Sequence, residues 1–274
     1  MPSVDAAGTE LYYERSGKGE PLLLIQGMSA THATWGRPFL EDLERSFECT
    51  VFDNRGMGLS GAAEIPFTTA DMAADTAALL DALELQSAHV VGISMGGMIA
   101  QELALAHPER IRTLTLGATY CGGPESSLMA PEDMQMLGTA MSSGERSEVH
   151  RAMWEINLSP GFRADDSRYA AFVEMAEAFR APLPVIVQQM RACGAHDTSE
   201  RLPQIVLPTL VVHGDADRLL GHGNGREIAA LIPGARLETL AGIGHMFWWE
   251  QPQRAAELIR EHALGSSLPL TLNT

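Results

Sequence analysis

The chain has 274 residues, of which 45% are hydrophobic and 20% are charged, as in ordinary globular proteins. Its formal net charge is -16, and Lys18 is its only lysine. Nucleic acids and anionic membranes are bound by clustered Lys and Arg, so this balance argues against both as partners. The amino terminus has no basic and apolar leader, and three widely spaced cysteines do not suggest a disulfide framework. We therefore expect a cytoplasmic protein.

The first half of the chain alternates short apolar runs with helical patterns, which is typical of a mostly parallel sheet with crossover helices. Strands are predicted over residues 11–14, 21–27, 49–54, 89–94 and 111–118. Residues 68–85 begin with a threonine cap and repeat apolar side chains every three or four positions, which predicts an amphipathic helix.

The stretch "GMGLSG" over residues 56–61 matches the glycine pattern of dinucleotide-binding sites. Such a site needs a helix that begins within the motif and an acid at the end of the next strand. Here Pro66 and a non-helical stretch follow, while Asp71 and Asp75 fall inside the predicted helix. The sequence therefore argues against a dinucleotide, and no cofactor is expected.

Residues 121–205 contain no convincing strand. Helical patterns occur over 131–142, 145–157, 166–181 and 183–193. We interpret this block as a helical cap over the carboxyl edge of the sheet, where α/β folds bind ligands. The core would then comprise residues 1–120 and 206–274. Half of the chain's methionines fall in the cap, either to fill gaps in its packing or to form an adaptable apolar ceiling over a pocket.

The sheet pattern returns near the end of the chain, with strands predicted over 208–215 and 235–242 and a last helix within 251–263. Earlier, "GISMG" puts Ser94 at the end of a strand and the start of a helix. The glycines could hold a nucleophile on a strained turn or only permit a tight turn.

A serine hydroxyl becomes a good nucleophile only beside a base that a third group orients. Asp217 follows the strand at 208–215, and His245 lies between the last strand and the last helix. The order Ser, Asp, His, each after a strand, is the order found in α/β-hydrolases. Asp215 is the rival acid in "HGDAD", a stretch that lacks the further ligands a metal site would need, so no metal is expected.

On four motifs the chain resembles the α/β-hydrolase superfamily over nearly its whole length: "GISMGG" at 92–97, "DNRGMGLS" at 53–60, "HGDAD" at 213–217 and "GIGH" at 242–245. It is most similar to small capped bacterial esterases, lactonases and methyl esterases. The resemblance implies that Ser94 is the nucleophile, His245 the general base and acid, and Asp217 the orienting acid. The family's spacing favours Asp217 over Asp215.

The oxyanion of a tetrahedral intermediate needs two preorganised N–H donors. The resemblance assigns them to the backbone of Met95, after the nucleophile, and of Met28, after Gly27. Gln26 stands where relatives commonly have His, so the bracing of this loop differs. Candidate pocket residues are Gln26, His32, Trp35, Met153 and Met246; for His32 and Trp35, helix packing is the alternative.

A serine rather than an aspartate at the nucleophile position excludes the haloalkane dehalogenase and epoxide hydrolase relatives. The expected reaction is hydrolysis of a carboxylic ester or lactone through an acyl-enzyme, with a medium-sized, largely apolar acyl or alcohol portion. Two alternatives remain: a C–C bond or enol-lactone hydrolase of aromatic catabolism, and a non-catalytic homologue that only binds a ligand. A homodimer is left open.

Overall fold

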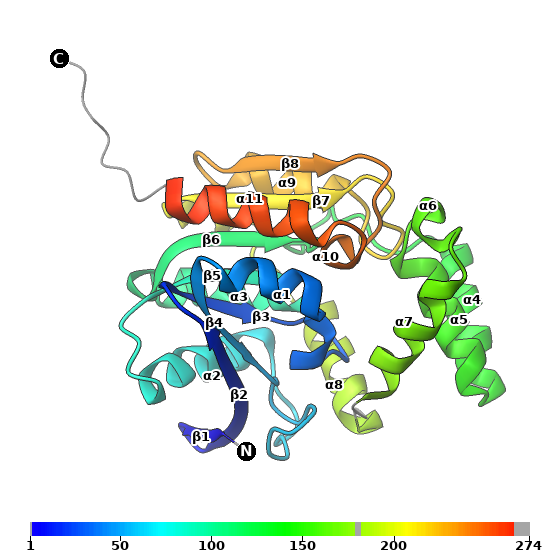
Figure 1. Cartoon of the computed structure of the whole chain (residues 1–274), viewed down its shortest axis with the longest axis horizontal. Helices are drawn as coiled ribbons and strands as arrows, with labels where there is room; N and C mark the ends of the chain where they lie inside the picture. The colour runs from blue at the N-terminus through cyan, green and yellow to red at the C-terminus, as the bar shows by residue number, and fades with distance from the viewer. Residues whose placement is uncertain (1, 179–181, 266–274) are drawn as a thin grey trace.

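The computed structural model describes residues 2–178 and 182–265. Within these residues the strands form one eight-stranded sheet (Figure 1). In spatial order they are β1 (Ser3–Ala6), β2 (Thr9–Gly17), β4 (Phe47–Phe52), β3 (Glu20–Ile25), β5 (Ala88–Ile93), β6 (Ile111–Gly117), β7 (Thr209–Gly214) and β8 (Arg236–Leu240). β2 pairs antiparallel with both β1 and β4, and every other pairing is parallel. The mostly parallel sheet predicted from the sequence is confirmed.

Helices cover both faces of the sheet (Figure 1). One face packs on α1 (Arg37–Glu44), α10 (Phe247–Glu250) and α11 (Pro252–Gly265), and the other on α2 (Thr69–Ala82), α3 (Met95–Ala106) and α9 (Gly223–Leu231). Central strands are therefore buried on both sides, and every residue of β5 and β7 is inaccessible. This explains why they appear in the sequence as continuous apolar runs rather than as alternating patterns.

Between β6 and β7 the chain forms a group of helices that lies beside the carboxyl ends of the strands (Figure 1). Its helices are α4 (Pro131–Ser143), α5 (Arg146–Asn157), α6 (Pro160–Arg163), α7 (Ser167–Ala178) and α8 (Leu183–Gly194). The predicted stretch 166–181 corresponds to α7, although residues 179–181 lie outside the described residues. The short α6 was not predicted, because its four residues are too few to show a helical pattern.

Neither interpretation of the cap methionines accounts for all of them. Met134, Met141 and Met190 expose 54%, 51% and 51% of their surface. The cap helices bury only part of their surface, and in α4 the buried residues are Asp133 and Ala140. These three methionines therefore neither fill gaps in the packing nor line a closed ceiling.

The glycine motif at 56–61 forms a turn after β4 rather than the start of a helix. Gly56 and Gly58 have positive φ angles of 73° and 52°. A side chain on Gly58 would collide with the carboxylate of Asp53, which is fully buried. The Asp53 carboxylate accepts the backbone N–H of Leu59 at 2.9 Å. The glycines thus let the turn wrap around a buried acid, which removes the dinucleotide interpretation.

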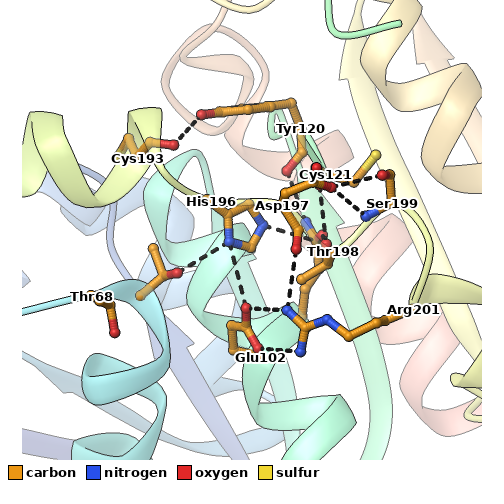
Figure 2. Close-up of polar contacts among 12 residues, drawn as sticks. Thr68, Glu102, Tyr120, Cys121, Cys193, His196, Asp197, Thr198, Ser199 and Arg201 are labelled. Atoms are coloured by element: carbon orange, nitrogen blue, oxygen red, sulfur yellow. Dashed lines mark hydrogen bonds and ion pairs between the residues drawn. The ribbon is translucent and has the colours of Figure 1, made fainter. Parts of the chain in front are cut away.

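The segment that leaves the core after β6 and the segment that returns after α8 are bonded to each other (Figure 2). The Thr198 N–H donates to the Cys121 carbonyl oxygen at 2.7 Å, and the Tyr120 hydroxyl donates to the Cys193 carbonyl oxygen. Gly122 has a φ of 79°, and a side chain there would collide with the backbone of the returning segment. The two segments that connect the cap to the core are therefore hydrogen-bonded to each other.

The edge hairpin is the main element that the sequence pattern missed. The strand predicted at 11–14 extends over Thr9–Gly17 and pairs with β1, which was not predicted. β1 is short, polar and mostly exposed, so no apolar run in the sequence indicates it.

Among the described residues, none of the helices is long and apolar enough to span a membrane.

Candidate active site

Ser94 lies between β5 and α3 in a strained backbone conformation, with φ 56° and ψ −124°. Such a positive φ is uncommon for a residue other than glycine. The Ser94 N–H donates to the Gly117 carbonyl oxygen at 2.9 Å, and the Thr119 hydroxyl donates to the Ser94 carbonyl oxygen at 2.7 Å. A side chain on Gly96 would collide with the carbonyl oxygen of Ile25 at the end of β3. The predicted strained turn is present, and its neighbours hold it in place.

Asp217, which follows β7, and His245, which follows β8, contact each other. Nδ1 of His245 lies 2.8 Å from Oδ2 of Asp217, and both side chains are almost fully buried. Oδ1 of Asp217 accepts the backbone N–H groups of Leu219 and Leu220, each at 2.9 Å. Burial raises the pKa of Asp217, but the neighbouring imidazoles outweigh it and hold the pKa below its ordinary range. Asp217 is thus an ionised acceptor that fixes the ring of His245.

His245 donates from Nδ1 to this carboxylate, so Nε2 of the neutral ring carries the lone pair that can take a proton. Within the described residues neither Nε2 of His245 nor Oγ of Ser94 has a hydrogen bond, and catalytic hydrogen bonds are often loose before substrate binds. Asp215, the rival acid, instead accepts the Gly242 N–H at 2.6 Å. The structure therefore pairs His245 with Asp217 and not with Asp215.

The loop after β3 lies against the serine. A Cβ on Gly27 would stand 3.0 Å from Cβ of Ser94. The N–H groups of Met28 and Met95 have no hydrogen bond among the described residues, which leaves both available as donors. This is the state required of an oxyanion hole.

Gln26 stabilises the same loop through hydrogen bonds of its side chain and its backbone. Its Oε1 accepts the Gly27 N–H at 2.8 Å, and its backbone carbonyl oxygen accepts from Nδ2 of Asn54 at 3.1 Å. Further along, the Ser29 N–H donates to Oε1 of Gln189 in α8, at 2.9 Å. The loop is thus held by amide side chains, one of which comes from the cap, in place of the histidine found in relatives.

His32 and Trp35 lie in the short 3-10 helix His32–Trp35 that follows this loop. Both the backbone N–H and Nδ1 of His32 contact Oδ1 of Asp53, at 2.7 and 2.9 Å. Burial lowers the pKa of His32, yet its contact with Asp53 outweighs this and raises it overall. Trp35 is fully buried and stacks on Phe39 at 5.7 Å between ring centres. These contacts fit the packing alternative for both residues.

Met153 and Met246 lie where the cap meets the loop that carries His245. Met246 is 5% exposed and its N–H donates to the carbonyl oxygen of Asn157, the last residue of α5, at 3.1 Å. Met153 is partly buried in the same apolar cluster. Glu250 accepts the N–H groups of Gly244 and Ser159, each at 2.9 Å. One carboxylate therefore links the base loop to the cap.

Four polar residues that contact the candidate triad or the loops around it were not identified from the sequence: His213, Glu250, Gln189 and Thr119. Only His213 carried a signal, as a histidine inside an apolar strand just before Asp217. Its Nε2 lies 3.2 Å from Oδ2 of Asp217.

Among the described residues, no group of three or more His, Cys, Asp or Glu could hold a metal ion.

Comparison with known proteins agrees with this geometry. The model of the alpha/beta hydrolase fold matches residues 20–152. The chain is 32% identical to the "putative carbamate hydrolase RutD" of Azorhizobium caulinodans, covering 90% of this chain and 92% of that protein. It is 30% identical to the rhodomycin D methylesterase DauP of a Streptomyces species, over 82% and 84% of the two chains. The chain belongs to the α/β-hydrolase family.

A solved structure supports the same grouping. The chain superimposes with a TM-score of 0.79 on Est816, described as an N-acyl homoserine lactone degrading enzyme. The two are 28% identical, and the match covers 94% of this chain and 99% of that one. The protein is a hydrolase of the bacterial esterase and lactonase type within this family.

Proposed function

We propose that the protein hydrolyses a carboxylic ester or lactone through an acyl-enzyme intermediate on Ser94. The observation that carries the proposal is the buried contact of 2.8 Å between His245 and Asp217, in a chain whose Ser94 is held at a φ of 56° between β5 and α3. The names of relatives that act on a methyl ester and on a lactone support the same chemistry.

In the proposed mechanism, Oγ of Ser94 attacks the carbonyl carbon while Nε2 of His245 removes the hydroxyl proton. Asp217 stays ionised and stabilises the imidazolium that forms. The N–H groups of Met28 and Met95 bind the developing oxyanion, and α3 adds the positive end of its dipole. The imidazolium then gives its proton to the leaving alcohol, and water releases the acid by the reverse route.

We propose a largely apolar substrate. Met28 exposes 36% of its surface beside the serine, and Met246 follows the catalytic histidine directly. Both side chains would accept an acyl or alkoxy group by burying apolar area, and methionine adapts to varied shapes.

Labelling by a fluorophosphonate probe tests the nucleophile. Ser94→Ala removes the attacking oxygen, so we expect loss of labelling and at least a 1000-fold drop in kcat on p-nitrophenyl butyrate. Ser142→Ala, on the exposed surface of α4, serves as the matched control and should keep both. Folding is checked by circular dichroism. Turnover retained by a folded Ser94→Ala would refute the assignment.

A substrate panel separates the reaction classes. It contains p-nitrophenyl acetate and butyrate, an N-acyl homoserine lactone, an aromatic methyl ester, an aryl carbamate and a C–C ring-cleavage product. Turnover of the esters or the lactone above the last two supports the proposal. Turnover of the ring-cleavage product alone would favour the C–C hydrolase. Absence of both fluorophosphonate labelling and turnover would favour the ligand-binding homologue, whereas labelling that is lost in His245→Ala supports an enzyme.

A further inference from the structure

The carboxylate of Asp217 faces two imidazoles rather than one. Oδ2 lies 2.8 Å from Nδ1 of His245 and 3.2 Å from Nε2 of His213. His213 is the fifth residue of β7 and is fully buried, so no water competes for this contact. The proposed mechanism above uses only the first of these rings.

Hydrogen-bond partners fix the protonation of the His213 ring. Nε2 lies 2.8 Å from the Leu220 carbonyl oxygen, which can only accept, so Nε2 carries a proton. Nδ1 is buried with no hydrogen-bond partner among the described residues. A second proton there would leave a buried charge and an unsatisfied donor, which is costly. The ring is therefore neutral, and its N–H edge is directed at the acid loop.

The surrounding backbone makes room for this ring. Gly225, in α9, packs directly against it, and a Cβ at that position would stand 2.8 Å from Nδ1 of His213. The Leu220 carbonyl that binds Nε2 belongs to the same turn whose N–H groups bind Oδ1 of Asp217. One imidazole thus contacts both the turn and the carboxylate.

We infer that His213 is a positioning residue that orients the Asp217 carboxylate and withdraws part of its charge from His245. This inference rests on the proposed triad. An N–H beside Oδ2 stabilises the ionised acid, so less of its negative charge acts on the imidazolium formed during attack. The acid limb of the pH–rate profile then falls at a lower pH than it would beside Asp217 alone.

Other ionisable groups face this pair from the neighbouring elements. The ring of His222 lies 5.8 Å from that of His213, and Arg226 and Asp215 act on His222 from beyond it. Glu250 of α10 binds the Gly244 N–H on the other side of His245. None of these groups is itself replaced in the variants below, which change the contacts of the His213 ring with Asp217, with the Leu220 carbonyl oxygen and with the His222 ring.

The test compares His213→Leu with His213→Gln. Leu removes the N–H, whereas Gln carries its amide nitrogen at about the distance of Nε2 from the backbone. For His213→Leu we expect the acid limb of kcat/KM to move upward by roughly 0.5–1 pH unit and kcat to fall about 3–10-fold, with KM within about twofold. His213→Gln should restore both. An acid limb that stays in place, or moves downward, in a folded His213→Leu would overturn the inference.

A second measurement keeps the inference separate from the proposed function. The ring nitrogens of His245 are titrated by NMR in ¹⁵N-histidine-labelled protein, for the unaltered chain and for His213→Gln and His213→Leu. An upward shift of the midpoint in His213→Leu alone supports the inference even if no substrate is turned over. Equal midpoints in all three proteins refute it even if the esterase is active. Should His213→Leu fail to fold, His213→Asn, whose shorter amide cannot reach Oδ2, takes its place with the same expected shift.

Discussion

At the scale of single residues, the backbone of the loop after β3 carries as much of the proposed chemistry as any side chain. The N–H of Met28 is unpaired among the described residues, while its neighbours Gly27 and Ser29 are both tied by amide oxygens. Such a donor costs the protein an unmade hydrogen bond until an oxyanion accepts it, which is how preorganised sites stabilise a transition state.

Replacing Met28 by proline tests this donor directly, because proline has no backbone N–H. We expect kcat on p-nitrophenyl butyrate to fall roughly 100–1000-fold, as when one oxyanion donor is removed, with KM little changed. Met28→Leu keeps the N–H and the apolar side chain and should stay within a few-fold of the unaltered protein. If Met28→Pro is folded by circular dichroism and keeps its kcat, the second donor lies elsewhere.

The residues of the candidate triad could be found in the sequence because each follows a predicted strand. Apolar runs identify the strands before Ser94 and Asp217, and His245 lies between the last strand and the last helix. Their supporting partners could not be found in that way. Gln189 reaches Ser29 across 160 positions, and Thr198 reaches Cys121 across 77. No local pattern encodes such contacts, since they arise only once the cap has docked on the core. His213 was visible as a buried histidine, but its partner depended on a turn geometry that spacing alone does not define.

At the scale of elements, the join between cap and core holds a buried histidine that makes stability depend on pH. His196 lies between Glu102 and Thr198 (Figure 2). Its Nδ1 is 3.1 Å from the Thr69 hydroxyl. Burial lowers its pKa from 6.5 to about 4, against the opposing charge of Glu102. The folded state therefore holds His196 neutral in a range where the unfolded chain binds a proton.

The sign of the effect follows from proton linkage. Above pH 6.5 neither state is protonated at His196 and there is no penalty. As the pH falls from 6.5 to 4, His196 binds a proton in the unfolded chain but stays neutral in the folded chain. The free energy of unfolding therefore falls by an amount on the order of 3 kcal/mol. Urea unfolding at pH 7, 5.5 and 4.5 measures this. His196→Gln should show a shallower loss over the same interval, because the other histidines titrate in both proteins; parallel curves would contradict the assignment.

At the scale of the whole molecule, the cap is fastened to the two loops that carry the proposed acid and base. Beside Asp217, the guanidinium of Arg218 forms an ion pair with Asp133 of α4 and donates to the Glu155 carbonyl oxygen of α5 at 3.2 Å. Beside His245, Glu250 binds the backbone at Ser159 of the cap. A movement of the cap relative to the sheet would therefore displace both loops. The position of the cap thus affects both the volume beneath it and the geometry of the proposed triad.

Because Asp133 holds Arg218 from a cap helix, we expect a substitution of Asp133 to change KM by an amount that depends on the size of the substrate. Asp133→Asn removes the charge that holds Arg218, and a partly exposed pair of this kind is worth about 1 kcal/mol, or roughly fivefold in an equilibrium. A loosened cap binds a long acyl chain less well but scarcely touches a two-carbon one. We therefore expect KM to rise roughly fivefold for p-nitrophenyl octanoate and to stay nearly constant for the acetate. Glu132→Gln, one residue earlier on the exposed face, removes the same charge without the ion pair and should change neither value. An equal rise in KM for both esters would contradict this prediction, because the effect would then not depend on the length of the acyl chain.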